Sequence, residues 1–249
     1  MSRLLPVLAA CTALASPALA FDIDAMNAQE RSAFGEEVRR YILENPQIIM
    51  EAVAILEEQR EADQTQNDVS LVAANSPDLF QDTNSWSGGN PDGDISLVEF
   101  VDYRCGYCRR AHDEVAALVS SDGNIRLIIK ELPILGEASV LSSRFAIATR
   151  QLFGDEAYKL AHDALIALNS DVTPAVLSRL ANTLGLDSQA ILIQMDSQDV
   201  TDVINANRRL AQKMAINGTP TFVMETVMLR GYLPLDGLRQ VLADVRTDG

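Results

Sequence analysis

The sequence predicts an α/β protein in which a helical segment precedes a small sheet and a large helical insertion interrupts that sheet. Two apolar runs, 95–101 and 125–129, are rich in β-branched residues and have the length of buried strands. A helix-like segment that ends near Ser120 joins them, and two further strand-like runs, 221–225 and 227–230, follow a long helical stretch. The apolar content of 47% is enough for a packed core.

Length and composition exclude several classes of protein. A chain of 249 residues is expected to form one or two domains. Twenty basic residues against 35 acidic ones give a net charge of -15, which argues against a nucleic-acid partner. Three cysteines are too few for a disulfide-stapled scaffold, and no apolar run reaches the length of a membrane span.

The first twenty residues have the pattern of a signal peptide. Arg3 is followed by an apolar run over 4–14, and the small residues at 18–20 predict cleavage before Phe21. Export implies a periplasmic or extracellular compartment, where disulfides persist. A lipoprotein-type cleavage at Cys11 is the alternative, but the apolar stretch before that cysteine is short for a signal of this kind.

Residues 21–66 are predicted to form an N-terminal helical segment. Asn27 and Glu30 have the spacing of a capping box, and Asn45-Pro46 is typical of a helix that begins again. Apolar residues form wide stripes at helical spacing: Phe34, Val38, Tyr41, Ile42, Ile49, Ala52, Val53 and Leu56. Such a stripe could pack onto the protein's own domain or form a stalk for self-association.

The rest of the chain divides into a linker and a second domain. The acidic, Gln- and Asn-rich stretch 57–70 suggests a helix that ends in a linker, and 67–94 is assigned as linker and lead-in. Residues 95–249 form the second domain, with the helical insertion at about 137–216. Helices are expected at 138–153, 155–168, 174–184, 188–195 and 200–216, and around 238–245 at the C-terminus.

The chemistry is predicted at Cys105 and Cys108, directly after the first buried strand. A strand, a helix and a strand with CxxC at the first turn are typical of a thioredoxin-like redox unit. The helix dipole favours an anion at Cys105, which makes it the nucleophile, while Cys108 is placed to resolve a mixed disulfide. Arg104 and two further arginines at 109–110 add positive charge, and the absence of histidine between the cysteines favours a moderately oxidising couple.

Two other uses of the cysteines are weaker interpretations. A structural disulfide across so short a loop removes little unfolded-state entropy. A zinc site needs two further ligands, and beyond the signal segment the chain offers only His112 and His162, the latter far along the sequence. We expect His112 to be a helix residue that could tune the cysteines, and His162 to be structural or exposed.

Three segments together resemble the DsbA-like thiol:disulfide oxidoreductases of bacterial envelopes. They are Glu99–Cys108, Lys130–Gly136 and Gly218–Phe222, in the expected order and separation. The resemblance extends from about Gly89 to the C-terminus. It implies a thioredoxin-like fold with a large helical insertion.

The resemblance also implies roles for individual residues. Cys105 and Cys108 match the redox pair, and Pro220 matches a proline whose peptide bond is cis and which faces the CxxC. Glu99 matches a buried acid beneath the disulfide, although a partly exposed strand residue is the alternative. Burial would raise the pKa of this carboxyl, which could then relay a proton to Cys108. Lys130 is a candidate partner of Glu99.

Two departures from the family pattern bear on the reaction. Gly106-Tyr107 stands where the strong oxidases have Pro-His, and Thr219 before the proline is more typical of isomerases and reductases. The N-terminal extension resembles that of ScsC-type and alpha-proteobacterial DsbA-like proteins, some of which assemble through it. Several redox sites on one particle would suit disulfide isomerisation.

We therefore interpret the chain as a periplasmic dithiol oxidoreductase acting on cysteines of unfolded or misfolded exported proteins. Thr219, Pro220 and Tyr107 would bind substrate, a membrane protein would be the redox partner, and no organic cofactor or metal is required. The sequence does not decide between an oxidase and an isomerase, and it favours both over a dedicated reductase. The alternative from another class is an envelope protein that binds a metal or a partner and whose CxxC is idle.

Overall fold

The computed structural model describes residues 23–248, with side chains for residues 23–247. The predicted signal peptide, its cleavage point before Phe21 and the alternative anchor Cys11 lie outside the described residues. Contacts divide the chain into two units, with the boundary between Gln59 and Arg60. None of the helices described is long and apolar enough to cross a membrane.

The first unit holds helix α1 (Ala28–Glu44) and the beginning of helix α2 (Gln47–Phe80). The predicted capping box is confirmed: the Asn27 side chain accepts hydrogen bonds from two backbone N–H groups, and the Glu30 carboxylate accepts one from the Asn27 N–H at 2.9 Å. No residue of α1 is buried. Most large apolar side chains of α1 and early α2 are exposed, while Ile42 and Ile48 are half-buried. The exposed ones are Phe34, Val38, Tyr41, Leu43, Ile49, Met50, Val53, Ile55 and Leu56.

Helix α2 continues to Phe80 and crosses the stretch that the sequence suggested as a linker. In the second unit its buried residues recur every three or four positions: Asp68, Val72, Asn75 and Leu79. Val72 and Leu79 pack into a hydrophobic cluster with the sheet. Burial of this face stabilises a helix whose composition alone reads as a linker, because tertiary packing outweighs local propensity.

The second unit is built on a five-stranded sheet with the order β1-β3-β2-β4-β5. Neighbouring strands are antiparallel except for the central parallel pair β2 and β3. The strands are β1 (Trp86–Gly89), β2 (Ile95–Val101), β3 (Ile125–Glu131), β4 (Thr221–Met224) and β5 (Val227–Arg230). The four predicted strands are confirmed. Edge strand β1 was not predicted, because its four residues include two glycines and lie in a turn-rich stretch.

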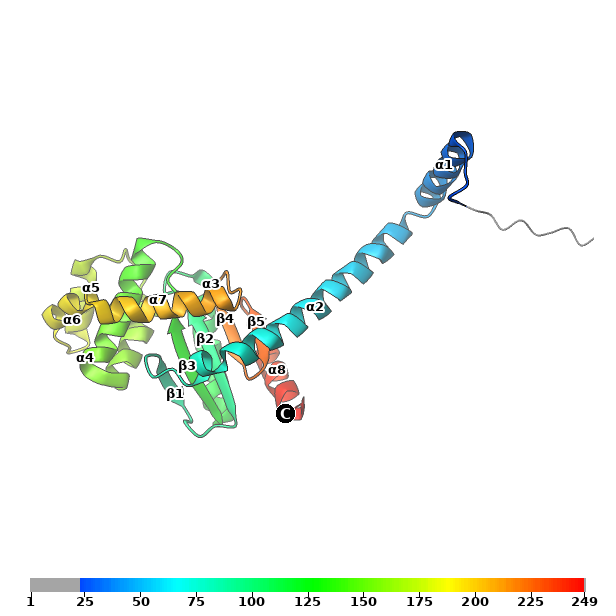
Figure 1. Ribbon diagram of the computed structural model, residues 1–249. Coiled ribbons are helices and arrows are strands. Elements are labelled where there is room, and N and C mark those ends of the chain that lie inside the picture. Colours follow the sequence, from blue (N-terminus) through cyan, green and yellow to red (C-terminus); the bar gives the residue numbers. More distant parts are fainter. Residues whose placement is uncertain (1–22, 249) are drawn as a thin grey trace, which may run out of the picture. The chain divides into compact units, whose positions relative to one another are not determined.

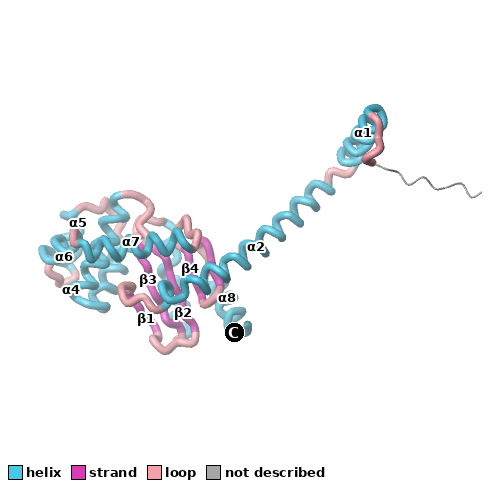
Figure 2. Tube along the Cα trace, viewed as in Figure 1, coloured by secondary structure: helices cyan, strands magenta, loops and turns pink. Residues whose placement is uncertain are grey.

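Helices cover both faces of the sheet (Figures 1 and 2). Side chains such as Leu97 and Ile129 pack with α3, α4 and α8, while Val98 and Ile128 pack with α2 and α7. These helices and those between them are α3 (Gly106–Asp122), α4 (Glu137–Ala167), α5 (Pro174–Thr183), α6 (Ser188–Met195), α7 (Gln198–Lys213) and α8 (Leu235–Asp248).

Helices α4 to α7 lie between β3 and β4 in the chain and form the predicted insertion. Gly154, at φ +83°, interrupts α4 between the two helices that the sequence predicted there. Removing α4 to α7 leaves β-α-β, an antiparallel strand pair and a final helix. The predicted fold class, thioredoxin-like with a large helical insertion and preceding helices, is confirmed.

Candidate active site

Cys105 is the N-cap residue of α3, where it follows the sharp turn after β2. The side chain of Asp102 shapes this turn: one carboxylate oxygen accepts the N–H of Arg104 at 2.8 Å, and the other accepts those of Ile134 and Leu135 at 2.8 and 3.1 Å. Asp102 is fully buried. It therefore fixes the entry to the CxxC helix against the loop after β3, a role the sequence did not indicate.

The two cysteines are thiols in this structure and have opposite electrostatics. A hydrogen bond from the Cys108 thiol lowers the pKa of Cys105 to about 5; the backbone N–H groups of Cys108 and Tyr107 and the side chain of Thr219 act in the same direction. The same thiol-thiol bond, together with burial, raises the pKa of Cys108 well above its usual range. Cys105 keeps 7% of its surface exposed and Cys108 none. The predicted division into thiolate and shielded thiol is thus present in the geometry.

The loop before β4 faces Cys105. The Thr219–Pro220 peptide bond is cis, as the resemblance implied, and the Cys105 thiol donates to the Thr219 carbonyl at 3.1 Å. A cavity of about 340 Å³ beside this loop is lined by residues 217–221, Arg230 and Gly231. The structure therefore brings together the cysteine and the loop that the sequence assigned to substrate.

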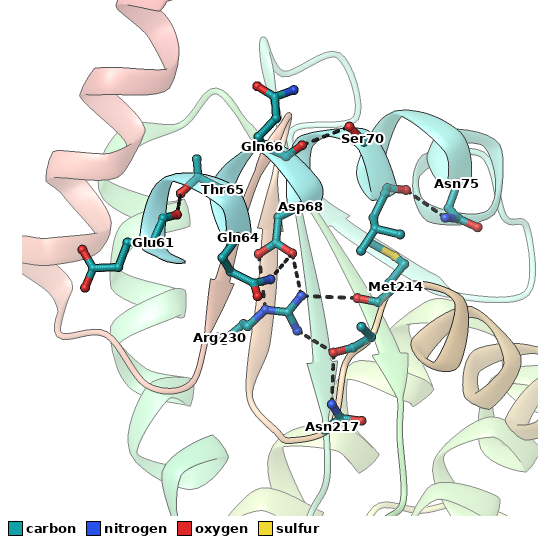
Figure 3. Close-up of polar contacts among 12 residues, drawn as sticks. Glu61, Gln64, Thr65, Gln66, Asp68, Ser70, Asn75, Met214, Asn217 and Arg230 are labelled. Atoms are coloured by element: carbon teal, nitrogen blue, oxygen red, sulfur yellow. Dashed lines mark hydrogen bonds and ion pairs between the residues drawn. The ribbon is translucent and has the colours of Figure 1, made fainter. Parts of the chain in front are cut away.

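Arg230, at the end of β5, ties this loop to helix α2 (Figure 3). Its guanidinium donates to both oxygens of Asp68, at 2.7 and 3.3 Å, and to the Ala215 carbonyl at 2.7 Å. Gln64 donates a further hydrogen bond to Asp68 at 2.7 Å. One side chain thus connects α2 with the residues that lead into the cis-proline loop, and nothing in the sequence pattern had marked it.

Glu99 lies on β2 and is buried, with 4% of its surface exposed. Its carboxyl accepts no hydrogen bond from any residue that the structure describes. Burial raises the pKa of Glu99 to about 8, and the negative charge of Cys105 acts in the same direction. Glu99 also lines a cavity of about 400 Å³. The raised pKa favours the protonated carboxyl at neutral pH, and the cavity gives this carboxyl access to open space.

The expected pairing of Lys130 with Glu99 is wrong. Lys130 donates to Asp82 at 2.8 Å and to Ser85 at 3.1 Å. On the paired strands Glu99 lies opposite Ile129, one position away from Lys130. Because successive side chains of a strand point to opposite faces, the Glu99 carboxyl and the Lys130 ammonium are separated by the sheet.

The remaining tuning candidates do not touch the sulfurs. Arg104 donates to the carbonyls of Leu168 and Ser170, so it anchors the end of α4. His112 lies 3.2 Å from Asp163. No arginine is among the causes that lower the pKa of Cys105.

Tyr107 is 58% exposed and stacks on Tyr232, with 6.1 Å between ring centroids. The Arg110 guanidinium lies over both rings, at 5.7 and 5.5 Å from their centroids. Gly231, next to Tyr232, donates its N–H to the Pro220 carbonyl at 2.9 Å. These stacked rings therefore lie beside the cis-proline loop.

A second polar cluster lies under the turn before the CxxC. Glu131 accepts hydrogen bonds from the hydroxyls of Tyr158 and Tyr103, and burial raises the pKa of Glu131 to about 7. The Tyr103 hydroxyl is also 3.0 Å from Nδ1 of His162. His162 is not remote from His112, as the sequence separation suggested: their ring centroids are 5.3 Å apart. Burial lowers the pKa of His162 to about 3, with His112 acting in the same direction.

Comparisons with known proteins agree with this geometry. A DSBA-like thioredoxin domain matches residues 96–243, and the N-terminal domain of the copper resistance protein ScsC matches residues 30–63. Disulfide bond formation protein D of Bacillus subtilis is 22% identical over 166 residues, which are 62% of this chain and 73% of that protein. A Na(+)/H(+) antiporter NhaA of Salinispora tropica is 27% identical over 134 residues, or 54% of this chain. The chain spans only 20% of the antiporter's length.

Solved structures show the same architecture. A thioredoxin-like oxidoreductase from Silicibacter pomeroyi is 39% identical, with a TM-score of 0.65, over 69% of this chain and 97% of that one. BcfH of Salmonella enterica Typhimurium is 25% identical, with a TM-score of 0.73, over 86% of this chain and 95% of that one. The domain match covers more than half of the sequence, and it contains the CxxC helix and the cis-proline loop; the chain accordingly belongs to the family of DSBA-like thioredoxin domains.

Proposed function

We propose that this protein is an envelope thiol:disulfide oxidoreductase that forms or rearranges disulfides in exported proteins through Cys105 and Cys108. The observation that carries the proposal is the position of Cys105. Its sulfur lies at a helix N-terminus, its pKa is lowered to about 5, and it contacts the Thr219 carbonyl at 3.1 Å. A thiolate at that position is both a nucleophile and a good leaving group.

In the oxidising direction a substrate thiolate attacks Cys105 of the enzyme disulfide, and Cys108 leaves. Its high pKa makes Cys108 a poor leaving group unless it gains a proton, and the protonated Glu99 is the acid that supplies it. A second substrate thiolate then attacks the substrate sulfur of the mixed disulfide and releases the Cys105 thiolate. The substrate loses two electrons, the enzyme gains them, and a membrane redox partner would remove them.

In the isomerising direction the reduced protein starts the reaction. The Cys105 thiolate attacks a substrate disulfide, and the freed substrate thiolate attacks another substrate disulfide before Cys105 is displaced. No electrons are gained or lost overall. Because Cys105 is ionised at neutral pH, either direction is open to this site.

Substrate binding is proposed for the cis-proline loop and the stacked rings beside it. The backbone of Thr219 would pair with an extended peptide, as in strand addition, while Pro220 would shape the loop that presents it. Tyr107, with Tyr232 and Arg110, would contact side chains that flank the reacting cysteine. An unfolded chain offers both an extended backbone and accessible side chains beside its cysteines, whereas a folded protein rarely does.

A homo-oligomer formed through residues 21–66 is proposed as well. The apolar side chains of α1 and of early α2 are exposed, and they recur at helical spacing. Contiguous apolar surface of this kind marks an interaction site, and a second copy of the chain carries the complementary stripe. Light scattering on the protein with and without residues 21–66 tests this: loss of the oligomer on truncation supports it, and a monomeric intact protein contradicts it.

Trapping of the mixed disulfide tests the redox function. Reduced Cys108→Ser should accumulate a covalent complex with an unfolded substrate that carries a disulfide, since the Cys105 thiolate attacks that disulfide, one substrate thiolate leaves, and no Cys108 thiol is present to resolve the bond, whereas Cys105→Ser should not. Refolding of scrambled ribonuclease by the oligomer and by the truncated protein then separates isomerase from oxidase. Thiol exchange that persists unchanged in Cys105→Ser would favour the alternative of a binding protein with an idle CxxC.

A further inference from the structure

Three potential metal ligands converge between α3 and α4, on side chains with no part in the proposed thiol chemistry. His112 comes from α3, and His162 and Asp163 come from α4. One ligand atom from each side chain lies within 4.8 Å of the others. Nε2 of His112 is 3.2 Å from Oδ1 of Asp163, close to the separation of two ligands that share a zinc ion with bonds of about 2.0–2.1 Å.

The surroundings orient and support His162. It is buried, and its Nδ1 is 3.0 Å from the Tyr103 hydroxyl, which in turn lies 3.4 Å from Glu131. A ligating histidine usually has its second ring nitrogen held in this way by a carboxylate or a group bound to one. The buried Glu131 also places an acid two hydrogen bonds from the imidazole, where a cation would be favoured.

A cation already occupies the edge of this cluster. The ammonium group of Lys159 lies 2.7 and 2.6 Å from the two oxygens of Asp163. The Lys159 side chain is 40% exposed, so it can move into solvent without leaving a buried group unpaired. Lys159 therefore acts as a competitor that a stronger cation would displace.

Space for an additional ligand is present beside the histidines. The cavity of about 400 Å³ is lined by His112, His162 and Lys159, and also by Glu99. It holds room for water at an open coordination position. Two imidazoles and one carboxylate with an open position are a ligand set that suits zinc and similar first-row divalent ions.

We propose that His112, His162 and Asp163 form a site for a divalent transition-metal ion of the zinc class, separate from the cysteines. Lys159 closes this site when the ion is absent. The ion would bridge α3 and α4, and so connect the CxxC helix with the helical insertion. This proposal is independent of the proposed redox function.

The test is a calorimetric titration of the Cys105→Ser, Cys108→Ser protein with Zn²⁺, so that thiolates cannot bind the metal. We expect one ion per chain, and at least tenfold weaker binding in His112→Gln and in Asp163→Asn. Lys159→Gln should bind Zn²⁺ more tightly, because its ammonium no longer competes. Tyr103→Phe should weaken binding about tenfold through the orientation of His162.

Two controls keep the result decisive. His112→Gln and Lys159→Gln should each melt cooperatively without metal and keep the circular dichroism of the parent, so that a change in Zn²⁺ affinity reports the ligand and not unfolding. Co²⁺ should give the visible absorption of a tetrahedral site in the parent and not in His112→Gln. No binding by the parent, or binding that neither His112→Gln nor Asp163→Asn weakens, would overturn the proposal.

Discussion

Glu99→Gln is the substitution that most directly tests the electrostatics of the site. The pKa of Glu99 is raised from 4.5 to about 8 in the folded protein. Below pH 4.5 the carboxyl is protonated in both the folded and the unfolded chain, so it does not affect stability. Between pH 4.5 and 8 the unfolded chain ionises while the folded one does not, and stability falls as the pH rises.

The magnitude follows from the size of the shift. Each pH unit in that window costs about 1.4 kcal/mol, so the wild type should lose about 3 kcal/mol by pH 7 through Glu99 alone. Gln has no such penalty. Relative to the wild type, Glu99→Gln should therefore gain stability steadily from pH 4.5 to 8 and stay level above it.

Urea unfolding of the reduced proteins at a series of pH values measures this difference. Comparing the two proteins at each pH removes the opposite contribution of Cys105, which is common to both. A gap between wild type and Glu99→Gln that does not change from pH 4.5 to 8 would refute the raised pKa. Glu131→Gln is the matched control for chemistry: it removes another buried acid, yet should leave the formation of the mixed disulfide from the oxidised protein and a substrate thiol unchanged, whereas Glu99→Gln should slow that step tenfold or more.

Three further predictions concern the thiolate and the ion pairs. Thiolate absorbance of the reduced protein should show Cys105 half-ionised at about pH 5, and a midpoint near 9 would contradict the hydrogen-bonded thiolate. Arg230→Met removes the charged partner of the buried Asp68, to which Gln64 still donates, and should cost about 3 kcal/mol in urea unfolding, while the double variant with Asp68→Asn should recover part of that loss. Lys130→Met should destabilise the fold by removing the charged partner of Asp82, yet leave the pKa of Cys105 unchanged; a shifted thiolate pKa would show that Lys130 acts on the site after all.

Local sequence patterns predicted most of the fold because most of its elements carry their own signals. Three of these signals correspond to elements of the structure. The capping box at Asn27 begins α1, and the apolar run 95–101 is β2. Pro174 begins α5, and Gly185 follows its end. The elements that the sequence did not predict are those that form because of tertiary packing. Helix α2 runs through a linker-like composition because its second half is covered by the sheet, and β1 exists because it pairs with β3.

The site divides in the same way. Cys105 and the loop at Thr219 were predicted from motifs, since their chemistry is tied to short segments. Asp102, Arg230 and Tyr232 were not predicted, because each has at least one partner that is distant in sequence. Arg230, for example, bonds a residue 162 positions earlier. A single sequence holds no signal for such pairs.

Strand register explains the one predicted pair that failed, and it separates two functions of the sheet. β2 and β3 pair with Phe100 opposite Lys130 and with Glu99 opposite Ile129. A shift of one residue would have placed the acid and the amine on one face. As folded, Glu99 faces the side packed by α3 and α4, where the thiol chemistry lies, and Lys130 faces the side packed by α2 and α7, where Asp82 follows the end of α2. Substitutions at Glu99 and Lys130, one position apart in register, should therefore have separate effects: the first alters the redox chemistry, and the second alters how α2 is held.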